Sequence, residues 1–103
     1  MKRFLIQYTF KLEPEAEQAW HARVNEFIAE LDRDPVLSGK VKYRCLKGNG
    51  TAYYHLAEVA DEAANAVLRD RPFFQKYTEE TKRVAGGAVE VTRLETIAET
   101  RAS

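Results

Sequence analysis

Apolar and polar residues alternate along four segments of the chain, residues 3–12, 40–46, 51–59 and 88–97. In the first segment every second residue is apolar, and these residues are Phe4, Ile6, Tyr8, Phe10 and Leu12. A period of two places side chains of one kind on one side of an extended backbone. The four segments are therefore predicted to be β-strands.

Two other segments repeat their apolar residues at spacings of three and four, which is typical of amphipathic helices. The first begins at Pro14 and ends near Asp34-Pro35, because the residue before a proline avoids the helical region. The second begins after Asp61, a good N-cap residue, and ends at Gly86-Gly87. Pro72 interrupts this second helix, so we expect two helical pieces with a break near residues 69–72.

The resulting order of elements is β-α-β-β-α-β, in which Gly48-Asn49-Gly50 supplies the hairpin turn between the second and third strands. This order is typical of the ferredoxin-like arrangement. The predicted fold class is α+β, with a four-stranded antiparallel sheet and two helices on one of its faces. The whole chain, residues 1–103, is expected to form this one domain.

The sheet face that the helices leave uncovered is not cleanly polar. Leu5 lies beside Gln7 and Thr9 on that face of the first strand, and the last strand adds Leu94. An exposed apolar surface of this kind usually marks an interface. We therefore expect a homodimer in which a second copy of the chain covers the sheet, since two-fold dimers are the commonest solution.

The charge balance argues against some classes of partner. The chain has 16 Lys and Arg against 16 Asp and Glu, so its formal net charge is zero. Nucleic-acid binding is not expected without a basic excess. No apolar run approaches the roughly 20 residues that span a bilayer, so no membrane association is expected.

The single cysteine, Cys45, cannot form an internal disulfide, a cysteine-based zinc site or an iron–sulfur cluster. The separation of His21 and His55 gives no metal-ligand spacing either, so no metal is expected, and no other cofactor is predicted. Gln7, Thr9 and Lys11 interrupt the apolar stretch near the start of the chain, which argues against a secretory signal. The predicted location is the cytoplasm.

Three residues on the strands are candidates for catalysis. His55 lies in the middle of the third strand, and an imidazole with a pKa near 6.5 could take a proton from a phenolic substrate. Tyr43 and Tyr54 could assist this deprotonation. The alternative is that His55 is a hydrogen-bonded structural residue and that the tyrosines are there as good strand formers. Because successive strand residues face opposite sides, Tyr53 and Tyr54 cannot both point into one pocket.

Four further aromatic residues are candidates for binding a flat substrate. They are Tyr8 on the first strand, Trp20 on the first helix, and Phe74 and Tyr77 near the break in the second helix. An aromatic wall with a few polar groups is typical of small-molecule pockets. The alternative is that these side chains form the core.

The run from Tyr54 to Tyr77 resembles a known family. A strand passing through Leu56 and Glu58 leads into the helix that begins Asp61-Glu62-Ala63-Ala64, and Arg71-Pro72-Phe73-Phe74-Gln75-Lys76-Tyr77 follows. This order and aromatic placement resemble the antibiotic biosynthesis monooxygenase group of the dimeric α/β-barrel superfamily. The resemblance implies homodimers whose sheets form a barrel. It also implies oxidation of aromatic or quinol-type molecules by molecular oxygen with no metal or flavin.

Three functions stay open at this point. The first is a cofactor-independent monooxygenase of the kind that the resemblance implies. The second is a non-catalytic dimeric module that binds a small molecule or has a structural role, since one fold hosts many functions. The third is RNA binding, because the RNA-recognition motif has the same order of elements. The zero net charge argues against this third function. The resemblance also argues against haem degradation, because the haem-degrading relatives use a histidine on the second helix and a tryptophan near the end of the third strand, and this sequence has neither there.

Overall fold

Within residues 1–102, which the computed structural model describes, four strands form one antiparallel sheet. The strands are β1 (Lys2–Thr9), β2 (Val41–Lys47), β3 (Ala52–Val59) and β4 (Glu90–Leu94). Their order across the sheet is β2-β3-β1-β4, and every neighbouring pair is antiparallel. This topology confirms the ferredoxin-like fold predicted from the order of elements.

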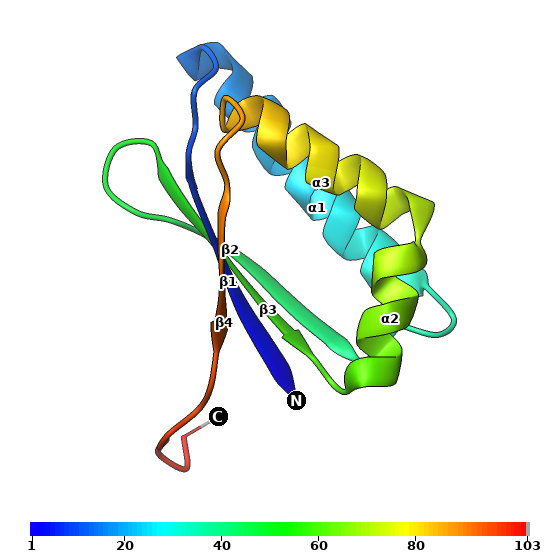
Figure 1. Cartoon of the computed structure of the whole chain (residues 1–103). Coiled ribbons are helices and arrows are strands. Elements are labelled where there is room, and N and C mark those ends of the chain that lie inside the picture. The colour runs from blue at the N-terminus through cyan, green and yellow to red at the C-terminus, as the bar shows by residue number, and fades with distance from the viewer. Residues whose placement is uncertain (103) are drawn as a thin grey trace.

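The helices all lie on one side of the sheet (Figure 1). They are the short 3₁₀ helix η1 (Pro14–Ala16), α1 (Glu17–Arg33), α2 (Glu62–Asp70) and α3 (Pro72–Val84). The Asp61 side chain accepts a hydrogen bond of 2.8 Å from the backbone N–H of Ala64, which caps α2. Arg71 has an extended backbone before Pro72, so the predicted break between two helical pieces is confirmed.

The first and the last strand along the chain, β1 and β4, are shorter than the alternation suggested. β1 ends at Thr9, and the next backbone N–H groups bond elsewhere, from Phe10 to the carbonyl of Thr51 and from Lys11 to that of Val84. β4 ends at Leu94, which is paired with Arg3 near the start of β1. Beyond Leu94 only Lys2 of β1 remains opposite the chain, so the pairing cannot continue along the predicted strand.

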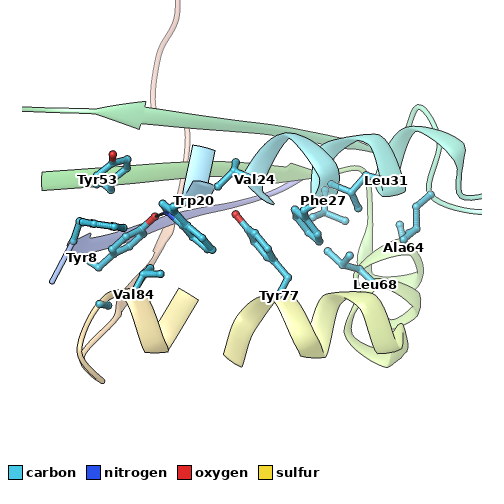
Figure 2. Close-up of a cluster of buried hydrophobic side chains, with 14 residues drawn as sticks. Tyr8, Trp20, Val24, Phe27, Leu31, Tyr53, Ala64, Leu68, Tyr77 and Val84 are labelled. Atoms are coloured by element: carbon cyan, nitrogen blue, oxygen red, sulfur yellow. Dashed lines mark hydrogen bonds between the residues drawn. The ribbon is translucent and has the colours of Figure 1, made fainter. Parts of the chain in front are cut away.

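A core of mainly aromatic and aliphatic side chains fills the space between the helices and the sheet (Figure 2). Trp20, Val24, Phe27 and Leu31 recur at spacings of four, three and four along α1, and all four are buried. Phe27 is fully buried, and its ring stacks on that of Tyr77 from α3, with centroids 3.8 Å apart. The strands β1, β2 and β3 contribute alternate residues to this core, since their side chains alternate between the two faces, whereas the residues of β4 are all exposed.

The opposite face of the sheet is not covered by any helix (Figure 1). Tyr54, Leu56 and Glu58 alternate with buried residues along β3, and each is only partly buried. Leu46 is 50% exposed, and its partner in the register is Tyr54. We call this surface the outer face, and its mixture of apolar and charged side chains is the one expected from the sequence.

Candidate functional site

A cavity of about 350 Å³ lies between the sheet and the helices. Its wall is mainly apolar, and the apolar residues are Phe4, Ile6, Phe27, Leu31, Val41, Ala57, Val59, Leu68, Phe74, Val89 and Val91. Val91, on the edge strand β4, is 62% exposed, so the cavity opens to solvent along this edge. Pockets that hold small molecules typically have this size and this apolar character.

His55 lines the cavity from the middle of β3, yet its side chain is fully buried. Both of its ring nitrogens have tyrosine partners. The Tyr8 hydroxyl lies 2.7 Å from Nε2, and the Tyr43 hydroxyl lies 2.5 Å from Nδ1. Burial lowers the pKa of His55 to about 4, because the charged imidazolium would lose its hydration. The imidazole is therefore neutral at pH 7.

The hydrogen bonds at His55 belong to a longer chain that we call the hydroxyl chain: Trp20, Tyr8, His55, Tyr43 and Tyr77. The Trp20 indole N–H donates to the Tyr8 hydroxyl over 2.8 Å. At the other end, the hydroxyls of Tyr43 and Tyr77 lie 3.0 Å apart, and that of Tyr77 lies 3.2 Å from Nδ1 of His55. The hydroxyl chain thus connects α1 through the sheet to α3, and it reaches the cavity at Tyr43 and Tyr77.

The donors and acceptors in the hydroxyl chain assign a tautomer to His55. The Tyr8 hydroxyl already accepts a hydrogen bond from Trp20, so it donates its own proton in a hydrogen bond to Nε2 of His55. Nδ1 then carries the proton and donates to Tyr43, and Tyr43 donates to Tyr77. In this arrangement each proton has a partner except that of the Tyr77 hydroxyl. Since Tyr77 lines the cavity, its hydroxyl is free to donate to a bound molecule.

The tyrosines of the hydroxyl chain stay protonated at neutral pH. Burial raises the pKa of Tyr8, Tyr43 and Tyr77 above the ordinary value of 10, because each phenolate would lose its hydration. The corner of the cavity where Tyr43 and Tyr77 meet therefore presents the Tyr77 hydroxyl as a hydrogen-bond donor. Such a corner favours a substrate oxygen that is an acceptor or carries negative charge.

The structure brings only part of the predicted site together. His55, Tyr43, Phe74 and Tyr77 all line the cavity. Tyr8 and Trp20 do not line it, and their polar atoms are used in the hydrogen bonds behind His55. They are core residues that hold the imidazole, and direct contact with a substrate in this cavity is not expected of them.

Tyr54 is placed on the outer face and does not belong to this site. It pairs with Gln7 of β1 and Leu46 of β2, which share that face. The physical reason is the period of two along β3, which sends Tyr54 away from the helices when Tyr53 and His55 face them. The prediction that Tyr54 acts beside His55 is therefore corrected.

Several polar residues of the cavity wall were not identified from the sequence. Asn65 and Arg69 come from α2, and Thr78, Thr81 and Lys82 come from α3. The spacing of these residues could have grouped them in two pairs. Asn65 and Arg69 are four residues apart, as are Thr78 and Lys82, so the members of each pair share a helix face. Because Pro72 breaks the helix, the sequence does not show which face of α2 and which face of α3 turn toward the sheet.

A second polar cluster lies outside the cavity, where α1 passes over Tyr53. The Tyr53 hydroxyl donates to Glu17 over 2.5 Å and lies 2.6 Å from Nε2 of His21. Lys47 is 3.0 Å from the same carboxylate. The hydrogen bond from Tyr53, followed by that from Lys47, lowers the pKa of Glu17. None of Glu17, His21 and Lys47 lines the cavity.

Residues 1–102, which the structure describes, contain neither a cluster of metal ligands nor a helix suited to cross a membrane. No group of three or more His, Cys, Asp or Glu side chains is arranged so that it could hold a metal ion. None of the helices combines the length and the apolar character needed to cross a membrane.

No protein-family model matches the sequence, and no curated protein is significantly similar to it. Solved structures are similar in fold. Rv0793 from Mycobacterium tuberculosis superimposes with a TM-score of 0.73 at 16% identity, covering 95% of this chain and 96% of that one. A structure described as an antibiotic biosynthesis monooxygenase has a TM-score of 0.74 at 15% identity, covering 95% of this chain and all of that one.

A third similar structure is the N63A mutant of SnoaB from Streptomyces nogalater, described as a cofactor-independent oxygenase. Its TM-score is 0.72 at 18% identity, and the match covers 98% of this chain and 97% of that one. At these identities the comparison establishes the fold, because one fold hosts many activities. The chain has the ferredoxin-like fold of the antibiotic biosynthesis monooxygenases, which confirms the resemblance predicted from its sequence.

Proposed function

We propose that this protein is a cofactor-independent monooxygenase that acts on an aromatic or quinol-type small molecule. One observation carries the proposal: an apolar cavity ends in a corner where the hydroxyls of Tyr43 and Tyr77 meet a buried, neutral His55. Similar structures described as monooxygenases, one of them cofactor-independent, support this choice among the functions that the fold can host.

The size and lining of the cavity suit a flat hydroxylated ring system. A dry apolar cavity of roughly 150 Å³ holds one benzene ring. The cavity here, at about 350 Å³, has room for about two fused rings. Phe27, Phe74 and Tyr77 supply ring faces and edges for aromatic packing. The hydroxyl of the bound molecule would lie against Tyr77.

The reaction requires an electron-rich anion. The substrate hydroxyl or enol loses its proton to solvent water, and the anion transfers one electron to molecular oxygen. The resulting superoxide and substrate radical then combine to form a C–O bond. Protonation of the peroxide anion by water gives a hydroperoxide. If the same carbon carries a hydrogen, loss of that hydrogen and cleavage of the O–O bond release water and leave a C=O group. The substrate thus loses two hydrogens and gains one oxygen atom, and the second oxygen atom leaves in water.

In this scheme His55 does not act as a strong base. With its pKa lowered to about 4, the imidazole is a poor acceptor for the proton of an ordinary phenol, whose pKa is near 10. The hydroxyl chain is better suited to stabilise an anion, since the Tyr77 hydroxyl can donate to the substrate oxygen. His55 is then a positioning residue that holds Tyr43 and, through it, Tyr77. A substrate that ionises readily fits this arrangement best.

We further propose that the protein is a homodimer paired through the outer face of the sheet. Leu5, Leu56 and Leu94 lie on this face, and Leu94 is 37% exposed in the single chain. A second copy would bury these side chains and add about 25 cal/mol of stabilisation for each Å² of apolar surface removed from water. The helices and the cavity lie on the other side of the sheet, so each copy would keep its own cavity.

A second candidate function is binding of an aromatic hydroxyl without catalysis. The low pKa of His55 favours this alternative, because a site built for proton abstraction would hold a group with a pKa nearer to 7. The same cavity and the same Tyr77 hydroxyl would serve for recognition. The two functions differ in whether oxygen is consumed.

Oxygen uptake tests the proposal. The purified protein is incubated with anthrone-type and quinol-type compounds under ¹⁸O₂, and uptake and label in the product are measured. We expect enzyme-dependent uptake with one labelled oxygen atom in the product. Tyr77→Phe should lower the rate at least about tenfold, which corresponds to the loss of one hydrogen bond to a charged oxygen. Tyr54→Phe is the matched control, because it removes the same atom from the outer face.

Two results would count against monooxygenation. Uptake no faster than in buffer for every compound, together with binding in the cavity, would leave the non-catalytic function. If Tyr77→Phe consumes oxygen as fast as the unmodified protein, the oxygenation does not take place at the Tyr77 corner of the cavity.

A further inference from the structure

The charged residues of the cavity wall are all cationic. Arg69 from α2 and Lys82 from α3 line the cavity, and no Asp or Glu of residues 1–102 does so. The chain as a whole has 16 basic and 16 acidic residues, so this bias is local. An excess of positive charge at the wall of an apolar cavity raises the local concentration of anions.

These two cations are available to a ligand. Within the described residues, Arg69 forms no salt bridge. Lys82 has one partner, Glu79, at the long distance of 3.8 Å, and both side chains are more than half exposed. Such a pair adds little stability and can open at low cost. In contrast, Arg23 and Arg71 are committed to carboxylates at 2.8 Å.

The helix geometry places a neutral polar group beside each cation. Asn65 and Arg69 share one face of α2, and Thr78 and Lys82 share one face of α3. Asn65 is 7% exposed and lines the cavity, and its side chain is one of the hydrogen-bond partners of the Glu62 carboxylate. Thr78 and Thr81 use their hydroxyl protons on the carbonyls of Phe74 and Tyr77, which leaves the two cations as the uncommitted donors of this wall.

The polar wall is separated from the Tyr77 corner along α3. The backbone positions of Tyr77 and Lys82 are five residues apart, which is a rise of about 7.5 Å along the axis of α3. That distance is comparable to the length of two fused aromatic rings, which the volume of the cavity can hold. One molecule could therefore contact both places with groups at its opposite ends.

We infer that Arg69 and Lys82 select an aromatic substrate that carries a carboxylate or a similar anionic group at the end opposite to its hydroxyl. The hydroxyl lies at Tyr43 and Tyr77, the rings lie on the apolar wall, and the anionic group lies beside Arg69 and Lys82. This inference rests on the proposed function, because it takes the Tyr77 corner as the place of the hydroxyl.

Binding of two probes tests this selection without using activity. Isothermal titration calorimetry compares 6-hydroxy-2-naphthoate, which has a hydroxyl and a carboxylate at opposite ends, with 2-naphthol, which lacks the carboxylate. We expect the carboxylate probe to bind the unmodified protein about tenfold or more tightly than 2-naphthol. Arg69→Gln/Lys82→Gln should remove this preference and leave the affinity for 2-naphthol unchanged. Lys42→Gln/Arg44→Gln, on the outer face, is the matched control and should keep the preference.

The possible failures can be told apart. Equal affinity for the two probes in the unmodified protein, or a preference that survives Arg69→Gln/Lys82→Gln, overturns the inference and leaves the cavity as a binding site. If neither probe binds the unmodified protein, both the proposed function and the inference fail. If the control variant also loses the preference for the carboxylate probe, the preference comes from the general surface charge, and the inference is overturned as well.

Discussion

The Tyr43 hydroxyl lies 2.5 Å from Nδ1 of His55, between the imidazole and the cavity corner at Tyr77. A molecule in the cavity would therefore contact a tyrosine hydroxyl rather than a free ring nitrogen. The histidine acts through its neighbours, and its own environment is that of the core. This relationship separates the chemistry of the site from the simpler scheme in which His55 abstracts a proton directly.

The burial of His55 predicts that acid destabilises the fold. The folded protein holds the pKa of His55 at about 4, whereas an unfolded histidine titrates near 6.5. Between these values the unfolded state binds a proton that the folded state does not, so the free energy of unfolding falls as the pH is lowered from about 6.5 to 4. The expected loss between pH 7 and pH 4.5 is about 2 kcal/mol, measured by urea unfolding at pH 7, 5.5 and 4.5.

His55→Gln is the control for this prediction. Its unfolding free energy should be lower at pH 7 and nearly independent of pH above about 4.5. The carboxyls of Glu17 and Asp34, whose pKa values are lowered by hydrogen bonds, lose their stabilisation only at more acidic pH. The account of His55 is contradicted if the variant loses as much stability between pH 7 and 4.5 as the unmodified protein.

Asp34 is predicted to stabilise the junction between α1 and α3. It accepts hydrogen bonds from the backbone N–H groups of Val36 and Leu37 at 2.9 and 3.0 Å, and Arg71 lies 2.8 Å away. Asp34→Ala should lower the free energy of unfolding by about 2–3 kcal/mol, because it leaves two backbone donors and a guanidinium without an acceptor. Arg71→Ala should cost about 1 kcal/mol, since Asp34 keeps its backbone partners. Equal costs in urea unfolding would refute this ranking.

Cys45 is predicted to react slowly. Burial raises the pKa of its thiol to about 11, so about a thousandth of it is thiolate at pH 8. Alkylation by iodoacetamide, followed by mass spectrometry, should be much slower in the folded protein than in urea. A folded-state rate equal to that of the unfolded chain would show that the thiol is not shielded.

The proposed dimer predicts a mass of two chains in native mass spectrometry. Leu56→Lys, in the middle of the outer face, should give monomers, because the dimer would have to bury an unpaired ammonium group. Ala22→Lys, on the exposed side of α1, is the matched control and should stay dimeric. A monomeric unmodified protein at micromolar concentration would contradict the proposal.

The periodicity of the sequence was enough to predict the fold, because each element has a local cause. Pro72 separates α2 from α3, Asp61 caps α2, and Gly50 has the positive φ of 63° that the hairpin turn requires. The length of β4 was predicted less well, because a strand ends where its neighbour ends. That depends on the register with β1, which no local pattern contains.

The candidate site could be predicted only in part for the same reason. Aromatic residues and His55 were recognised by type, and Tyr77 and Phe74 by their place near the helix break. The choice between Tyr53 and Tyr54 depends on which face of β3 meets the helices. The cationic wall of Arg69 and Lys82 depends on how α2 and α3 are rotated about their axes. Both are tertiary properties, and the structure was needed to assign them.

The central claim is that an aromatic hydroxyl binds at the Tyr77 corner of the cavity. The most direct test is a ¹H–¹⁵N NMR titration with 2-naphthol, repeated with Tyr77→Phe. We predict shifts confined to the cavity residues Ile6, Thr78 and Val91, with an affinity about tenfold weaker in the variant. Shifts on the outer face at Leu5 and Leu56, or no shifts at all, would contradict the claim.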